Sequence, residues 1–391
     1  MSYRFNLNET SFHGYGAIQN IVPEVKGRDF KKAFVCTDPD LVKFKVVNKV
    51  LDLLTEAGLE YTLYDNIKPN PTIENVQTGV KALKDSGADY IIAVGGGSSM
   101  DTAKAIGIIA TNPEFADVRS LEGASPTKKA CLPIIAVPTT AGTAAEVTIN
   151  YVITDEERHR KFVCVDPHDM PIIAVVDPDM MGTMPKGLTA ATGMDALTHA
   201  IEAYTASLRS NFSDPLALKA IEMVNENLVN SFNGDEEARS LMHEAQCLAG
   251  MAFSNALLGI VHSMAHKVGA VFHIPHGCAN AIFLPYVIQY NRKECENRYA
   301  DIARVLKLEG KSDSELTNSL INKIREFNVA LNIPATMKEY GITEVDFLAN
   351  VKHIAHNAVL DACTGSNPRT IDDETMEKLL SCTFYGSEVK L

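Results

Sequence analysis

The stretch YIIAVGGGSSMDTAKAIG, residues 90–107, carries the strongest local evidence for the fold. Residues 90–94 form a continuous apolar run, which predicts a strand buried on both faces, and the residues after the glycines predict a helix. The glycines at 95–97 let the backbone approach an anion, and the free N–H groups at a helix start favour negative charge. The stretch therefore predicts a phosphate-binding turn in an α/β sheet. A plain tight turn capped by Ser98 or Ser99 is the alternative.

Similar apolar runs flank this stretch in the first half of the chain. Strands are predicted at residues 33–37, 60–64, 133–138, 161–165 and 172–177, with helix-like segments between them. From about residue 185 the pattern changes to helical spacing, and one helix is predicted to start with Asp214 as its cap and Pro215 at its first position. We therefore expect an α/β domain with a mostly parallel, Rossmann-like sheet at residues 1–184 and an all-helical domain at residues 185–391.

Polar residues follow two further predicted strands, at the sheet edge where α/β proteins bind ligands. Asp38 follows the strand at 33–37; its carboxylate can accept both hydroxyls of an adenosine ribose and repels a 2′-phosphate, which favours NAD over NADP. Thr139, Thr140 and Thr143 in PTTAGTAAEVT follow the strand at 133–138 and can hold a pyrophosphate or a ribose. Ordinary turn and capping roles are the alternative for each of these residues. Asp38 also precedes the glycines, whereas the usual Rossmann fingerprint has its acidic residue after them.

Histidines are concentrated in the second half of the chain. Four of the 11 lie between positions 262 and 276, where an even spread would put about 0.4. In GMDALTHAIEAY and VHSMAHKVGA, two pairs of metal-ligating residue types are spaced i, i+4, so each pair shares one helix face. The pairs are Asp195 with His199 and His262 with His266. A carboxylate with several imidazoles binds a divalent ion such as Fe²⁺ or Zn²⁺, so the sequence predicts a metal site.

The spacing of His262 and His266 also invites comparison with the zinc proteases. In those enzymes a glutamate follows the first histidine and acts as the general base. Here that position is Ser263. An ion without an adjacent base is better suited to polarising a bound oxygen than to activating water.

The composition excludes several classes of partner. Asp and Glu outnumber Lys and Arg by 49 to 36, giving a net charge of −13, which repels nucleic acid. We find no apolar run long enough to span a bilayer and no signal-peptide pattern at the start. The eight cysteines lie singly, without Cys-x-x-Cys spacing. We therefore expect a cytoplasmic protein that binds neither nucleic acid nor membranes.

Taken together, four motifs resemble the iron-containing (group III) alcohol dehydrogenase family, whose fold is related to that of dehydroquinate synthase. The motifs are GGGSSMDTAKAIG, PTTAGTAAEVT, DALTHAIEAY and HSMAHKVGAVFHIPHG, and the resemblance covers nearly the whole chain. Within the family, the segments at 112–123, 145–169 and 361–369 resemble the lactaldehyde reductases.

The resemblance implies a set of site residues. The metal ligands would be Asp195, His199, His262 and His276, with His266 beside the ion as a proton relay. The residues that would bind NAD are Asp38, Asn70, Gly96, Gly97, Ser98, Thr139, Thr140, Thr143, Asn150 and Lys161. Phe253 and Cys363 fall where the family builds its small substrate pocket, although both are also ordinary core residues.

The resemblance also implies an activity. We expect an NAD-dependent enzyme with Fe²⁺, or alternatively Zn²⁺, that interconverts lactaldehyde and 1,2-propanediol by hydride transfer, and related enzymes suggest a homodimer. Alternatives are another small-alcohol dehydrogenase, acting on 1,3-propanediol, butanol or ethanol, or a lyase like dehydroquinate synthase. A lyase site for a polyanion should carry several Lys and Arg side chains, and near the histidines we find only Lys267.

Overall fold

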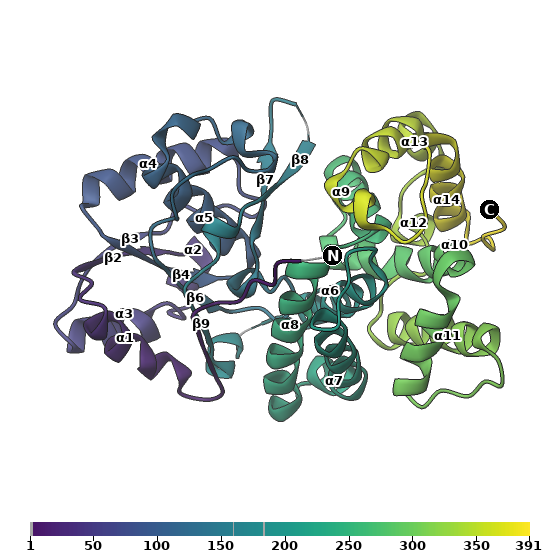
Figure 1. Ribbon diagram of the computed structural model, residues 1–391, viewed down its shortest axis with the longest axis horizontal. Coiled ribbons are helices and arrows are strands. Elements are labelled where there is room, and N and C mark those ends of the chain that lie inside the picture. Colours follow the sequence, from purple (N-terminus) through teal and green to yellow (C-terminus); the bar gives the residue numbers. More distant parts are fainter. Residues whose placement is uncertain (1–2, 159, 183) are drawn as a thin grey trace. The chain divides into compact units, whose positions relative to one another are not determined.

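The backbone divides into two units, Met1–Met184 and Pro185–Leu391 (Figure 1). The computed structural model describes residues 3–158, 160–182 and 184–391. Each unit has its own pattern of elements, and each is considered separately below.

The first unit is built on a six-stranded sheet in the order β1-β9-β6-β4-β2-β3, in which every neighbouring pair is parallel. Its strands are β1 Thr10–His13, β2 Lys32–Cys36, β3 Glu60–Tyr64, β4 Tyr90–Gly95, β6 Ile134–Pro138 and β9 Ile173–Val176. Because all the strands run the same way, the carboxyl ends of β2, β4 and β6 share one edge of the sheet.

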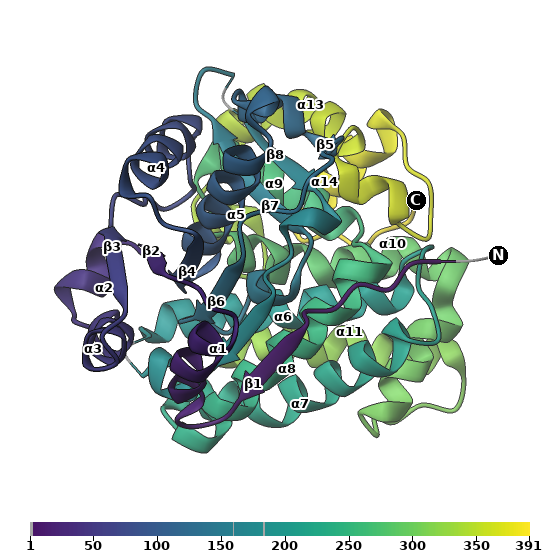
Figure 2. The same cartoon turned by 60° about the vertical axis from the view of Figure 1, so that its left-hand side comes forward.

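Helices cover both faces of this sheet (Figures 1 and 2). On one face, alternate strand residues such as Val35 and Ile92 pack with α1 (Ile21–Gly27) and α3 (Asn48–Glu56). On the other face, the intervening residues such as Phe34 and Ile91 pack with α4 (Ile73–Ser86) and α5 (Gly97–Thr111). Burial on two sides explains the continuous apolar runs. The short helix α2 (Pro39–Lys43) follows β2 directly.

One predicted strand does not belong to the main sheet. The segment at 161–165 is part of β8 (Arg160–Val165), which pairs antiparallel with β7 (Asn150–Asp155) and parallel with β5 (Gly123–Ala124) in a separate three-stranded sheet. Buried and partly exposed residues alternate along β7 and β8, as in strands covered on one face. Short 3-10 helices join the elements of this unit: η1 Ala17–Asn20, η2 Pro113–Phe115, η3 Val118–Leu121, η4 Ala145–Val147, η5 Pro167–Asp169 and η6 Pro178–Met181.

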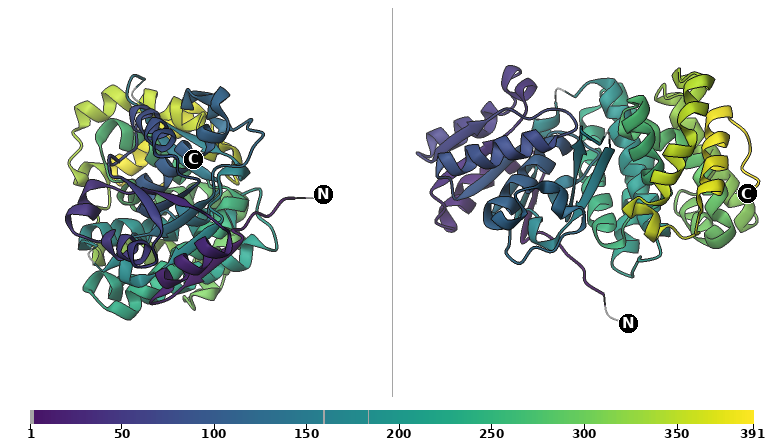
Figure 3. Two further views of the ribbon diagram at one scale, coloured as in Figure 1. Left: turned by 90° about the vertical axis from the view of Figure 1, so that its left-hand side faces the viewer. Right: turned by 90° about the horizontal axis from the view of Figure 1, so that it is seen from above.

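In the second unit, all the described elements are helices (Figure 3). Its elements are α6 Lys186–Thr205, α7 Ser213–Asn233, α8 Glu236–Ala256, α9 Ile260–Phe272, α10 His276–Val305, α11 Asp313–Ala330, α12 Met337–Tyr340, α13 Glu344–Val359, η7 Ala362–Ser366 and α14 Asp373–Tyr385. The α/β sheet and this helical unit confirm the predicted fold class.

The predicted start of α7 is wrong by two residues. The helix begins at Ser213, and Asp214 lies inside its first turn instead of capping it. The Asp214 carboxylate pairs with Arg298 at 2.7 Å, and this long-range ion pair competes with the capping role.

No single helix in the described part of the chain is long and apolar enough to cross a membrane. The pair α8 and α9 passes a length and composition test only when taken together, and it is bent by 104°.

Candidate functional site

Three helices of the second unit bring the predicted metal ligands together. Asp195 and His199 lie on α6, His262 on α9 and His276 at the start of α10. The Asp195 Oδ1 atom lies 3.6 Å from His262 Nε2, 3.5 Å from His276 Nε2 and 3.9 Å from His199 Nε2. Asp195, His262 and His276 form the tightest group, and His199 stacks its ring on His262 with centroids 4.5 Å apart.

These separations fit a single divalent ion. Four ligands about 2.1 Å from a tetrahedral ion are about 3.4 Å from one another. The Asn280 Nδ2 atom donates to Asp195 Oδ1 at 2.7 Å and lies 3.2 Å from both His262 Nε2 and His276 Nε2. Because the Nδ1 atom of His262 is hydrogen-bonded to Glu202 at 2.6 Å, its Nε2 atom is the one that can offer a lone pair to a metal ion. The donor set therefore has the chemistry and spacing of a metal site.

Charge interactions inside this cluster are strong because it is buried. Burial opposes ionisation of Asp195, but His199, His276 and His262 outweigh it and hold the pKa of the carboxyl well below its usual range. Burial likewise lowers the pKa of His262, yet the Glu202 and Asp195 carboxylates outweigh this and raise it to about 9. Both effects show that the site stabilises positive charge.

His266 lies beside the ligands and has a different set of contacts. Its ring stacks on His276 with centroids 5.2 Å apart, and its Nδ1 atom is 3.1 Å from Asp361 Oδ2. Lys267 pairs with the same carboxylate oxygen at 2.7 Å. Burial lowers the pKa of His266, and Asp361 offsets this only in part. The His266 ring is thus held through Nδ1, beside the predicted metal ligands.

The two predicted pocket residues contact different members of the site. Phe253 is buried on α8 and stacks on the His199 ring at 4.3 Å. Cys363 lies in η7, and its backbone N–H donates to Asp361 Oδ1 at 3.0 Å. Burial raises the pKa of the Cys363 thiol well above its usual value, so the thiol stays protonated. Both residues contact the histidine cluster or its immediate partners.

In the first unit, the glycine turn lies against the threonines after β6. Gly96 precedes α5, and Gly97 is its first residue. A Cβ atom on Gly97 would lie 2.8 Å from Thr143 Cγ2, and one on Gly96 would lie 3.2 Å from Thr140 Cγ2. Glycine is therefore needed here for close approach, and the predicted turn and threonines form one wall. Thr139 continues the pairing with a backbone bond to Gly95 O at 3.0 Å.

A second group of predicted cofactor residues meets at the start of α5. The Ser98 hydroxyl accepts from the Asn70 backbone N–H at 3.2 Å, and Lys161 Nζ donates to Asn70 Oδ1 at 2.7 Å. Asn70 adopts a left-handed φ of 57°. Burial lowers the pKa of Lys161, with Asp101 opposing the effect. These contacts link three segments far apart in sequence.

The remaining two predicted cofactor residues, Asp38 and Asn150, lie after β2 and at the start of β7. Asp38 follows β2 and caps α2, where its Oδ1 atom accepts from the N–H groups of Asp40 and Leu41, each at 3.0 Å. Asn150 begins β7, and its carbonyl accepts from the buried Lys104 Nζ at 3.0 Å.

Sequence reasoning missed several residues that contact the predicted metal ligands or His266, chiefly Glu202, Asn280 and Asp361. Glu202 lies seven residues after Asp195, two turns along the same face of α6, so helical spacing could have found it. Asn280 similarly follows His276 by four residues. Asp361 gave no such signal because its partner His266 is 95 residues away.

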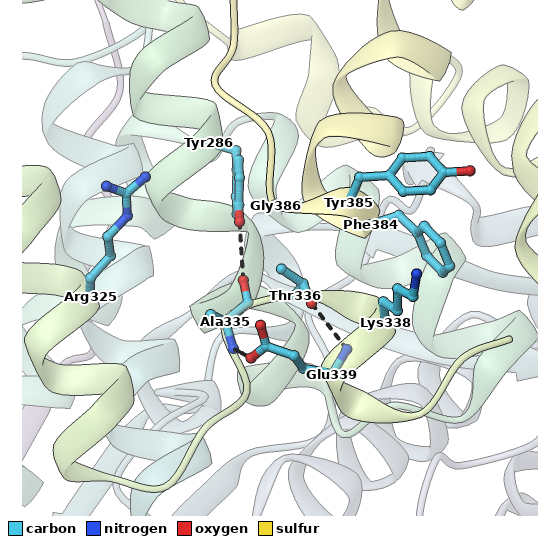
Figure 4. A pocket seen from close by; sticks show the side chains of 9 residues that line it. All are labelled: Tyr286, Arg325, Ala335, Thr336, Lys338, Glu339, Phe384, Tyr385 and Gly386. Atoms are coloured by element: carbon cyan, nitrogen blue, oxygen red, sulfur yellow. Dashed lines mark hydrogen bonds between the residues drawn. The ribbon is translucent and has the colours of Figure 1, made fainter. Parts of the chain in front are cut away.

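A separate surface cavity of about 500 Å³ lies among α10, α12 and α14 (Figure 4). Several of its polar groups bond within the protein: Tyr286 donates to Ala335 O at 3.2 Å, and Glu339 accepts from Ala335 N at 3.0 Å. Thr336 caps α12 through the N–H of Glu339. This cavity contains none of the predicted site residues.

Comparison with known proteins finds matching family models and relatives that cover nearly the whole chain. A family model described as "Iron-containing alcohol dehydrogenase" matches residues 8–178, and one described as "Fe-containing alcohol dehydrogenase family, C-terminal" matches residues 189–384. Lactaldehyde reductase of Escherichia coli (strain K12) is 52% identical over 95% of this chain and 98% of its own. NADPH-dependent butanol dehydrogenase of Clostridium saccharobutylicum is 50% identical over 99% of each chain. A solved structure of 1,3-propanediol oxidoreductase is 36% identical and superposes with a TM-score of 0.93 over 98% of this chain and 100% of its own.

Proposed function

The chain belongs to the iron-containing alcohol dehydrogenase family, and on that premise we propose that it interconverts lactaldehyde and 1,2-propanediol. The general activity, an alcohol dehydrogenase using a nicotinamide cofactor and a metal ion, is that of the family. The convergence of four donor atoms from α6, α9 and α10 is the observation that carries the proposal. The choice of substrate follows the 52% identity to lactaldehyde reductase.

In this proposal Asp195, His199, His262 and His276 hold Fe²⁺, with Zn²⁺ as the alternative. When bound, the ion polarises the carbonyl of an aldehyde and stabilises negative charge on its oxygen, while NAD(H) carries the hydride. Membership of this family removes the support for the alternative of a lyase like dehydroquinate synthase.

His266 is the proposed proton relay. Its Nδ1 atom is bonded to Asp361 at 3.1 Å, which leaves Nε2 to take up or release a proton. Phe253 supplies an apolar surface against His199, and the protonated Cys363 thiol adds a weakly polar one. These walls suit a small neutral substrate better than a charged one.

The nucleotide site is proposed on the first unit, residues 1–184. Gly96, Gly97 and Ser98, at the start of α5, would hold the pyrophosphate through backbone N–H groups. Thr139, Thr140, Thr143, Asn70, Asn150 and Lys161 would line the cofactor. Asp38 would bind the adenosine ribose and thereby select NAD over NADP.

We also propose a homodimer in the cytoplasm. The strand β1 is an edge strand that pairs only with β9 among the described strands, and exposed Leu7 and Tyr15 flank it. All eight cysteines are free thiols, which suits a reducing compartment.

Two relatives suggest the main competing substrates. The similarity to butanol dehydrogenase and to 1,3-propanediol oxidoreductase favours butanal and 3-hydroxypropanal as alternatives. Ethanol remains a further candidate from the family resemblance.

The test is an anaerobic assay of NADH oxidation after loading with Fe²⁺ or Zn²⁺. Lactaldehyde should give the highest kcat/KM in a panel with glycolaldehyde, propanal, butanal and 3-hydroxypropanal. His262→Ala should lose bound metal and at least 10³-fold in kcat, as an order of magnitude for a lost metal ligand. His353→Ala, on the exposed side of α13, should retain both. Flat activity across the panel, or normal metal content in His262→Ala, would refute the proposal.

A further inference from the structure

Glu202 is a buried carboxylate whose two oxygens are both occupied. It lies on α6 and is 5% exposed. Its Oε1 atom accepts from the backbone N–H of Val261 at 2.8 Å, and its Oε2 atom lies 2.6 Å from His262 Nδ1. Accepting at both oxygens suits the ionised form, which has no proton to donate. Burying such a group is costly unless it is paired, so its position needs a reason.

One role of the buried Glu202 carboxylate is to cap the start of α9. The residue before this helix, Gly259, has no side chain to cap it. Two residues from elsewhere take over: Asn367 accepts from Ile260 N at 3.3 Å, and Glu202 accepts from Val261 N. A Cβ atom on Gly259 would lie 2.8 Å from both Glu202 Oε1 and Asn367 Oδ1. The glycine therefore admits both caps to the helix end.

Capping alone does not explain Glu202, because Asn367 shows that a neutral amide can fill the same role. What Glu202 adds is the bond to the Nδ1 atom of His262. A carboxylate at 2.6 Å holds a proton on Nδ1, so when the ring gives up its second proton to a metal ion, the lone pair that binds the ion is on Nε2. The Nε2 atom is the one that lies 3.6 Å from Asp195 Oδ1.

We propose that Glu202 is a positioning residue for the metal centre: it fixes the tautomer of His262 and supplies a second negative charge beside the buried ion. This inference rests on the proposed metal site. With Asp195 and Glu202 both ionised, the two carboxylates balance the charge of a divalent cation among neutral imidazoles. An ion held in a buried site is favoured by such compensation.

The substitution that isolates this role is Glu202→Gln. The glutamine keeps the size of the side chain, and its oxygen can still cap Val261 N–H. Its NH₂ group then faces His262 Nδ1, which favours the opposite tautomer, with a proton on Nε2 where the ion must bind. We expect the apo-protein to keep its Tm within a few degrees and its affinity for Zn²⁺ or Co²⁺ to fall about 10-fold to 100-fold.

Two control variants separate positioning from folding. Asn367→Ala removes the other cap of α9 without touching His262, so it should lower Tm while changing metal affinity less than about threefold. Glu222→Gln makes the same chemical change on the surface of α7, where Glu222 pairs with Lys219, and should change neither quantity. Affinity is measured by competition with a chromogenic chelator, and the visible spectrum of the Co²⁺ form reports the coordination geometry.

The outcomes distinguish this inference from the proposed function. If wild-type protein and Glu202→Gln bind metal within twofold of each other while His262→Ala binds none, the role of Glu202 is refuted and the metal site stands. Equal losses in Asn367→Ala and Glu202→Gln would likewise refute it, because the effect would then come from helix position. If wild-type protein binds no metal, both proposals fail.

A second measurement needs no variant. In Zn²⁺-loaded protein labelled with ¹⁵N-histidine, long-range ¹H–¹⁵N spectra should show His262 with its proton on Nδ1 and its Nε2 atom bound. A proton on Nε2 would overturn the inference even if Glu202→Gln failed to fold.

Discussion

The Asp38 carboxylate caps a helix and is also the group that we propose binds the adenosine ribose. Its Oδ1 atom caps α2 through the N–H groups of Asp40 and Leu41. Among the contacts within the described chain, Oδ2 remains available to a ligand. The relative that is 50% identical is named as NADPH-dependent, whereas we propose NAD for this chain, so the choice between the two cofactors is a property to test. A negative charge at this position would repel a ribose 2′-phosphate.

Replacing Asp38 by Asn tests this selection without removing the helix cap, since Asn caps about as well as Asp. We expect kcat/KM for NADPH to rise about 10-fold, because a repulsion of about 1 to 2 kcal/mol is removed, and kcat/KM for NADH to fall. Steady-state kinetics with both cofactors measure the ratio. Asp40→Asn, which changes an exposed neighbour on the same helix, serves as control. An unchanged ratio in Asp38→Asn would place the discrimination elsewhere.

Site residues were predictable from the sequence where their spacing places them on the same face of one helix. Asp195 with His199 and His262 with His266 are each separated by one helical turn, so their shared faces follow from helix geometry. Their partners were not predictable in the same way. His262 contacts Glu202, 60 residues away in the sequence, and His266 contacts Asp361, 95 residues away. Only the packing of α9 against α6 and η7 brings these pairs together.

At the scale of elements, the proposed metal site depends on how closely α6 and α10 approach. Gly277 follows His276 in the first turn of α10. A Cβ atom on Gly277 would lie 1.9 Å from the Ala191 carbonyl oxygen, a backbone atom of α6. A backbone contact cannot rotate away as a side chain can. The distance between the helices that carry Asp195 and His276 is therefore set by this glycine.

Gly277→Ala should push these helices apart. We expect a loss of at least 1 to 3 kcal/mol in the free energy of unfolding, as for overpacked cores, and weaker metal binding because the donor atoms separate. Gly187→Ala on α6, where a Cβ atom meets nothing within 4 Å, should be neutral or slightly stabilising. Urea unfolding and chelator competition give the two quantities. Tight metal binding in a stable Gly277→Ala protein would show that the helices can adjust.

Strand patterns explain which elements of the sheet were predictable. The runs at β4 and β6 are apolar at every position because helices cover both faces, so they stood out. The segments NYVITD of β7 and RKFVCV of β8 alternate in burial but not in hydropathy, so the sequence neither marked β7 as a strand nor separated β8 from the main sheet. Pairing partners themselves are set by tertiary packing, which a single sequence does not record.

At the scale of the whole molecule, the two proposed ligands belong to different units. Every residue assigned to the metal lies in 185–391, and every residue assigned to the nicotinamide cofactor lies in 1–184. A ligand stabilises the part of the protein that must stay folded to bind it, by RT ln(1 + [L]/Kd). At 100 times Kd this amounts to about 2.7 kcal/mol, or about 100-fold in the opening equilibrium.

Hydrogen exchange resolves this stabilisation along the chain. Removing the metal with a chelator should raise exchange by up to about 100-fold in α6, α9 and α10, whose side chains would hold the ion, and should leave β2, β4 and β6 nearly unchanged. Adding NAD to the metal-loaded protein should instead protect the start of α5 and the segment at 138–150. Mass spectrometry of peptides from both units, compared with and without each ligand, gives the measurement. If chelation exposed the sheet of the first unit as much as the helices, the two units would unfold together, and the assignment of separate ligand-binding domains would have to be abandoned.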